Sequence, residues 1–342
     1  MAQRRNLSSK LRFKTWDEWR LDPQAQAYRV MVFTPRGQYP RGVLRVPNGV
    51  FYADKNIVFA VVHSETWRSL DPDTPYSEFD WAMPQELRFL ASMMYCQLSH
   101  ETALYFYPIV QYRRSLHIGH LDLSSDDTVA AVRRLLLDKR QRIGPRSQHK
   151  SLLETKSQPY ALVSQDRFVF DRLGEFWRGI LPRNYVLLRG TYALLKGDML
   201  ARHYEFMEEA VIVTFIALEA SLELVRRHLQ SKGIKDPSAI DAQKWLHETF
   251  DAPFDLPEVI DRYFEEFYDQ RIMTMHPKSR FGEMPYAPLS VDDFFHLRTS
   301  IREIFAYLVS GRHAPDFDQR LAEHRARWPQ GTYSSGEPSA EA

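Results

Sequence analysis

The pattern of hydrophobic and polar positions divides the chain into a strand-rich first half and a helical second half. In the first half, short runs of β-branched and aromatic residues predict strands at Tyr28–Phe33, Val43–Val46, Asn56–Val62 and Ala103–Tyr112. Short connections that contain Gly and Pro favour an antiparallel meander over βαβ units. Two helices are expected among these strands, at Pro84–Leu98 and Asp126–Lys139.

In the second half the apolar residues recur at helical spacing, with almost no strand signal. The predicted helices are Asn184–Met199, His203–Leu229, Ser238–Phe250, Pro257–Met275 and Val291–Ser310. The whole pattern predicts an α+β protein in three parts. Residues 1–170 form a strand-rich mixed α/β domain, and residues 171–312 form an all-α helical bundle. Residues 313–342 form a C-terminal extension that is expected to be disordered after about residue 329.

Composition narrows the class of protein. The chain has 342 residues, of which 44% are hydrophobic and 26% charged, as in a globular protein with a sizeable core. No run approaches the roughly 20 apolar residues of a membrane helix, and no apolar stretch follows the basic residues at the start. The single cysteine, Cys96, excludes an internal disulfide and a cysteine-based zinc site. We therefore expect a cytoplasmic protein with no membrane partner.

Charge is unevenly distributed between the halves. Residues 1–170 carry 24 Lys and Arg against 17 Asp and Glu, although the whole chain has a net charge of only +1. The segment 139–160 holds six Lys and Arg against one acid, and its five candidate contacts to nucleic-acid phosphates are Lys139, Arg140, Arg142, Arg146 and Lys150. Such a charge run also fits a solvated loop, so both interpretations stay open.

The segment with the clearest chemistry is Phe267–Pro277, which reads FYDQRIMTMHP. Arg271 and His276 are separated by four residues, and Pro277 favours a helix end at His276. The guanidinium of Arg271 can bind phosphate oxygens in a fixed fork. The imidazole of His276 can move a proton to or from a 2′-hydroxyl. These two residue types together predict phosphodiester cleavage that requires neither a metal nor a cofactor.

This arrangement resembles the HEPN superfamily of helical nucleases, whose hallmark is R-x4-6-H. The similarity extends over about residues 185–310 and is strongest to the ApeA-like HEPN group. The segment Phe215–Leu224 (FIALEASLEL) is similar to that group's helix with an acidic residue, and Asp292–Leu308 is similar to its closing helix. By this resemblance Glu219 would orient Arg271. Glu223 is an equal candidate and would alternatively pair with Arg227 at i,i+4.

The resemblance implies a function and a mode of assembly. HEPN ribonucleases cut RNA without a metal and leave a 2′,3′-cyclic phosphate. They act as homodimers, in which Arg and His of both subunits form one composite site. Arg271 would stabilise charge on the phosphate and His276 would activate the 2′-hydroxyl. A large N-terminal domain paired with such a nuclease resembles a regulated toxin or anti-phage abortive-infection effector, in which residues 1–170 would respond to a trigger or partner.

Two alternatives remain. Ile272 stands where many active members carry a polar residue, which favours a non-catalytic HEPN module for dimerisation or RNA binding. In addition, Leu116–His120 contains the HIGH string of nucleotidyltransferases, in which His117 and His120 would hold ATP phosphates at the start of a Rossmann helix. This second alternative lacks a KMSKS-like partner loop and upstream βαβ units.

Overall fold

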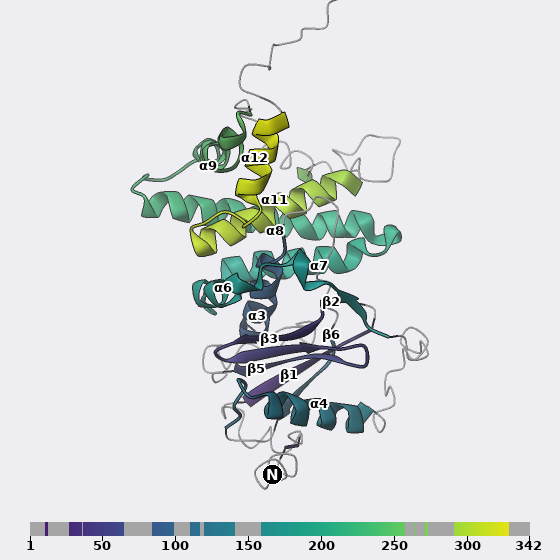
Figure 1. Cartoon of the computed structure of the whole chain (residues 1–342). Coiled ribbons are helices and arrows are strands. Elements are labelled where there is room, and N and C mark those ends of the chain that lie inside the picture. The colour runs from purple at the N-terminus through teal and green to yellow at the C-terminus, as the bar shows by residue number, and fades with distance from the viewer. Residues whose placement is uncertain are drawn as a thin grey trace, which may run out of the picture.

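The computed structural model describes residues 11–12, 27–35, 37–64, 84–98, 110–116, 120–140, 159–256, 264, 271–272 and 291–327. The predicted α+β class is confirmed, since an antiparallel sheet near the N-terminus is followed mostly by helices (Figure 1). No helix in these residues is long and apolar enough to cross a membrane.

The sheet has five strands in the order β3-β4-β5-β1-β6, and all neighbouring strands are antiparallel. Their bounds are β1 Ala27–Phe33, β3 Gly42–Val46, β4 Gly49–Ala53, β5 Val58–Ser64 and β6 Val110–Leu116. The expected meander is present in β3, β4 and β5, whereas β1 joins on the far side of β5. A separate parallel pair is formed by β2 Gln38–Pro40 and β7 Ala161–Val163.

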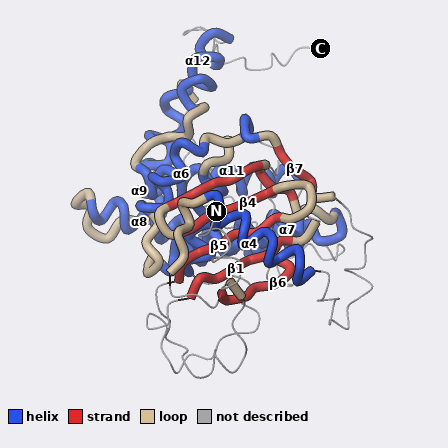
Figure 2. The backbone as a smooth tube through the Cα atoms, turned by 60° about the horizontal axis from the view of Figure 1, so that its bottom comes forward, coloured by secondary structure: helices blue, strands red, loops and turns tan. Residues whose placement is uncertain are grey.

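The central strands are buried on both faces, which explains their nearly continuous apolar sequences. On β1, Val30 and Val32 belong to the core under helix α4 (Asp126–Arg140), while Met31 and Phe33 belong to the core on the opposite face. Figures 1 and 2 show α4 lying across one face of the sheet, with the remaining helices beyond the other. The molecule thus has α4, the sheet and the helical part as successive layers.

The helical part contains seven α-helices in the described residues. They are α3 Pro84–Tyr95, α6 Leu173–Gly179, α7 Tyr185–Ala201, α8 Met207–Ser231, α9 Ala239–Leu246, α11 Val291–Ser310 and α12 Phe317–Arg327. Helix α3 lies between the sheet and the later helices and packs on β5, α6, α7 and α11. One core cluster therefore extends from Phe51 of the sheet through Phe89 of α3 to Phe305 of α11. This core cluster therefore contains residues of both predicted domains, 1–170 and 171–312.

Several element bounds differ from the sequence prediction. Helix α3 ends at Tyr95 instead of Leu98, because Gln97 pairs with Phe168 and the Leu98 N–H donates to the Arg167 carbonyl at 3.0 Å. Helix α8 begins at Met207, after a 3-10 turn at Tyr204–Phe206.

The remaining differences concern strand β6 and helix α12. Strand β6 extends to Leu116, whereas residues 103–109 of the predicted strand lie outside the described residues. Helix α12 occupies part of the predicted extension, whose residues 328–342 lie outside them too.

Candidate functional site

Helix α8 carries the candidate acidic residue, Glu219. The helix packs on both α7 and α11, and its residues Leu218 and Ala220 are buried in the shared core. Glu219, between them in sequence, turns away from that core, and 39% of its side chain is exposed. Successive helical residues point about 100° apart, so a buried neighbour on each side is compatible with this exposure. The fold thus presents a carboxylate at the surface from the middle of a rigid helix.

Arg271 meets this carboxylate. Of the predicted helix at 257–275, the described residues Phe264, Arg271 and Ile272 are helical, and Phe264 is buried. Nη1 of Arg271 lies 3.1 Å from Oε1 of Glu219, and 35% of the arginine side chain is exposed. An ion pair this exposed contributes at most about 1 kcal/mol to stability. Its main consequence is positional, because it places the guanidinium against the carboxylate of α8.

The structure separates the two acidic candidates on α8. Glu223, one turn after Glu219, accepts from Nε of Arg227 at 2.7 Å, and both side chains are exposed. This is the i,i+4 arrangement in which a Glu precedes an Arg on the same helix. Glu219 contacts Arg271 and Glu223 contacts Arg227, so the two glutamates have different partners.

The other candidates are not brought to this pair in the part of the chain that the structure describes. His276, together with Arg142, Arg146 and Lys150, lies outside the described residues. Lys139 and Arg140 are the last residues of α4, which covers the face of the sheet away from α8 (Figure 1).

The HIGH string also lies largely outside the described residues, which resume at the exposed His120. Oδ1 of Asp122 accepts from the N–H of Ser124 at 3.0 Å and from its hydroxyl at 2.6 Å, which forms a turn before α4 begins at Asp126. The strand that precedes the string, β6, pairs with β1 in antiparallel fashion. A Rossmann helix instead follows a strand of a parallel sheet, so this context differs from the one that the string requires.

Two further observations concern nucleophiles and metals. Cys96 is buried, and burial raises the pKa of its thiol, which disfavours the reactive thiolate. Among the described residues, no three His, Cys, Asp or Glu side chains come together in a way that could hold a metal ion.

A pocket that no sequence pattern indicates lies between α9, α11 and α12. Its walls include Phe250, Phe254 and Phe317, with Glu303 and Arg320 among its polar groups. The sequence gives no signal for it, because its three phenylalanines come from two segments, 250–254 and 317, whose convergence depends on the tertiary fold.

Comparison with known proteins gives no assignment: no protein-family model, no curated protein and no solved structure matches this chain.

Proposed function

We propose that the chain is an endoribonuclease that needs no metal and whose site is built on Arg271 and His276. The observation that carries the proposal is the contact between Glu219 and Arg271 at 3.1 Å. A guanidinium held by a carboxylate, yet about one-third exposed, can be reached by a phosphate from solvent. Glu219 acts as a positioning residue, since it contacts the arginine and not the reacting atoms.

The proposed reaction follows from these groups. His276 accepts the proton of the 2′-hydroxyl, and the 2′-oxygen forms a bond to the adjacent phosphorus. The bond from phosphorus to the 5′-oxygen breaks, and that oxygen leaves with a proton from a second imidazole. Arg271 stabilises the charge that develops on the phosphate oxygens. The products are a 2′,3′-cyclic phosphate and a 5′-hydroxyl, so atoms and protons balance.

The second imidazole implies a homodimer, in which each subunit contributes Arg271 and His276 to one composite site. We assign residues 1–170 the role of a regulatory part that responds to a trigger, as suits a toxin or anti-phage effector. The packing of α3 against both the sheet and α7 and α11 supports this assignment. A change at the sheet would be transmitted to the helices through one continuous core.

The decisive experiment is cleavage of a mixed RNA pool in EDTA, with analysis of the 3′ ends of the products. We expect cyclic-phosphate products from the wild type, and loss of cleavage in Arg271→Ala and His276→Ala. Circular dichroism should show that both variants stay folded. Cleavage that persists in both variants would contradict this site.

A second candidate function is a non-catalytic module for dimerisation or RNA binding. Ile272, next to Arg271, exposes 39% of its surface, at the position where the resemblance leads us to expect a polar residue in active members. RNA binding without cleavage, unchanged in His276→Ala, would select this alternative.

A further inference from the structure

The pocket between α9, α11 and α12 shares no residue with the Glu219–Arg271 pair. It has a volume of about 290 Å³, near the lower end of the range for small-molecule sites. One wall is the π-helical turn His247–Asp251 and the 3-10 turn Ala252–Phe254, which continue α9. Single π-turns are rare and occur often at functional sites. In Figure 1, α9 and α12 lie on the side of α8 away from the sheet.

Three of the ten residues that line the pocket are aromatic, and three are aliphatic. Phe250 and Phe254 come from the two turns, and Phe317 begins α12. The rings of Phe254 and Phe317 are 5.2 Å apart and nearly perpendicular, with an angle of 81° between their planes. One face of Phe317 is already covered by the ring of His313 at 3.8 Å, so Phe254 is the ring on which a flat, unsaturated ligand would stack.

The polar groups of the pocket include both charge signs. Nη2 of Arg320 lies 3.2 Å from Oε1 of Glu303, and both residues line the pocket together with Asp251 and Ser300. The arginine disfavours a cationic ligand, and the two carboxylates disfavour an anionic one. A neutral group with both donors and acceptors fits this lining, because it can donate to a carboxylate and accept from the guanidinium or the hydroxyl.

A cation lies beside the pocket. Nη2 of Arg325 donates to the carbonyl of Pro253 at 3.5 Å, and Pro253 immediately precedes Phe254. The last turn of α12 is basic, with His324, Arg325 and Arg327. A phosphate attached to a ligand in the pocket would therefore find positive charge outside it.

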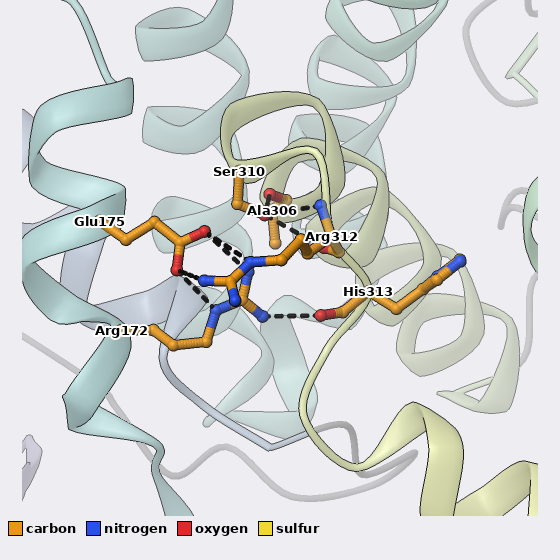
Figure 3. A network of polar contacts seen from close by, with 6 residues as sticks. All are labelled: Arg172, Glu175, Ala306, Ser310, Arg312 and His313. Carbon is orange, nitrogen blue, oxygen red and sulfur yellow. Dashed lines mark hydrogen bonds and ion pairs between the residues drawn. The ribbon is translucent and has the colours of Figure 1, made fainter.

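A polar network that includes Arg172, Glu175, Arg312 and His313 lies next to the pocket wall, and Figure 3 shows this network. The ring of His313 stacks on Phe317 at 3.8 Å, and the His313 carbonyl accepts from Nη1 of Arg172 at 2.6 Å. Glu175 accepts from both Arg172 and Arg312. The segment between α11 and α12 is thereby tied to α6, so that the aromatic wall is formed in advance of binding.

We propose that this pocket binds a nucleobase. The aromatic walls supply stacking, the mixed polar groups supply hydrogen bonds in both directions, and the basic turn beside it suits an attached phosphate. The base belongs either to a free nucleotide or to an RNA chain, and both sources share this chemistry. The site contains neither Arg271 nor Glu219, so the proposal does not depend on the nuclease proposal.

The test is isothermal titration calorimetry of the full chain with AMP, GMP, CMP and UMP, with ribose 5-phosphate as the ligand that lacks a base. We expect at least one nucleotide to bind and ribose 5-phosphate not to bind. Ser300→Phe should abolish binding because it fills the pocket, whereas Ser300→Ala should keep it. Phe254→Leu should weaken binding about tenfold through lost stacking. Phe206→Leu, an exposed phenylalanine outside the pocket, is the matched control and should bind as the wild type does.

A short single-stranded RNA in the same titration distinguishes the two sources of the base. RNA binding that is much tighter than that of any mononucleotide, and that loses this gain in Ser300→Phe, identifies a subsite for RNA, whereas equal binding identifies a free nucleotide. The mononucleotide titrations measure binding at the pocket and not cleavage, so their result is separate from the fate of the nuclease proposal. The proposal is overturned if no nucleotide or RNA binds, or if a folded Ser300→Phe, checked by thermal unfolding, binds as well as the wild type.

Discussion

Asp198 on α7 and Arg298 on α11 form an ion pair that is completely enclosed in the core. Nε of the arginine lies 2.8 Å from Oδ1 of the aspartate, and Nη2 lies 2.7 Å from Oδ2. The side chains are 0% and 1% exposed, respectively. Gln97, just after α3, is 3.5 Å from the same Nη2. The pair therefore joins α7 and α11 next to the end of α3.

We expect Asp198→Ala to lower the free energy of unfolding by about 3–5 kcal/mol, because it leaves the guanidinium of Arg298 buried and unpaired. The double variant Asp198→Leu, Arg298→Met should lose much less, since it removes both charges together. It also removes the repulsion between Arg298 and Arg302. Burial, as the largest cause, and this repulsion, as the next largest, lower the pKa of Arg302 to about 10. Urea denaturation of both variants measures the difference. A double variant as unstable as the single one would contradict this account.

The close packing of α7 against α8 and α11 depends on Gly190. A Cβ at this position would lie 2.5 Å from Cζ of Phe305 and 2.9 Å from Cβ of Ala220. We expect Gly190→Ala to destabilise the protein by about 1–3 kcal/mol, because a core helix must shift to admit the methyl group. Gly174→Ala is the matched control: its Cβ would meet only the end of the Arg178 side chain, at 3.5 Å. Thermal unfolding of both variants should show a loss at Gly190 alone.

His313, behind the pocket, should make stability depend on pH. Burial lowers the pKa of its imidazole below 6.5; Glu303 and Asp318 oppose this shift, and Arg320 adds to it. As the pH falls through 6.5, the unfolded chain binds a proton at this residue before the folded chain does. The contribution of His313 to stability is therefore complete above that pH and is lost as the pH falls toward the folded pKa.

The variant His313→Phe isolates this effect. It keeps an aromatic ring on Phe317, and Nδ1 of His313 has no hydrogen-bond partner among the described residues. We expect the wild type to lose more stability than the variant when urea denaturation is repeated below pH 6.5. His228, whose pKa is also lowered by burial and by Lys232, is present in both proteins and cancels in the difference. Parallel pH profiles for the two proteins would show that His313 does not titrate in this way.

The parts of the fold that were predictable are those in which local pattern and tertiary burial agree. The sequences of β1 and β5 are almost continuously apolar because both faces of the sheet are covered by other elements. Helix α11 spans the predicted Val291–Ser310. Strand β4 was missed because its first residue, Gly49, belongs to a run of turn-forming residues. In the structure Val46 pairs with Gly49, so Pro47 and Asn48 alone form the turn of a hairpin.

The candidate site was only partly predictable, for a different reason. Glu219 and Glu223 are four residues apart on one helix, so the sequence alone gives them equal standing. Their difference arises from the placement of Arg271, which comes from a segment about fifty residues later and is a matter of tertiary structure. The pocket near α12 depends in the same way on three segments, 246–256, 300–304 and 317–320, and no local pattern could locate it.

This difference between the two glutamates gives a sharp test of the proposed nuclease. We expect Glu219→Gln to lower RNA cleavage about tenfold to a hundredfold, because Arg271 loses the carboxylate that positions it. Glu223→Gln, on the same helix and equally exposed, breaks only the contact to Arg227 and should cleave as the wild type does. Neither change should alter the free energy of unfolding by more than about 1 kcal/mol.

Kinetics separate positioning from a structural role. Loss of position should appear in kcat, because the guanidinium must meet charge that develops in the transition state, and Glu219→Asp should restore part of the rate. Equal cleavage by Glu219→Gln and Glu223→Gln would show that the contact at 3.1 Å does not position a catalytic arginine. Such a result would favour the binding module, in which Arg271 and Ile272 form part of a contact surface.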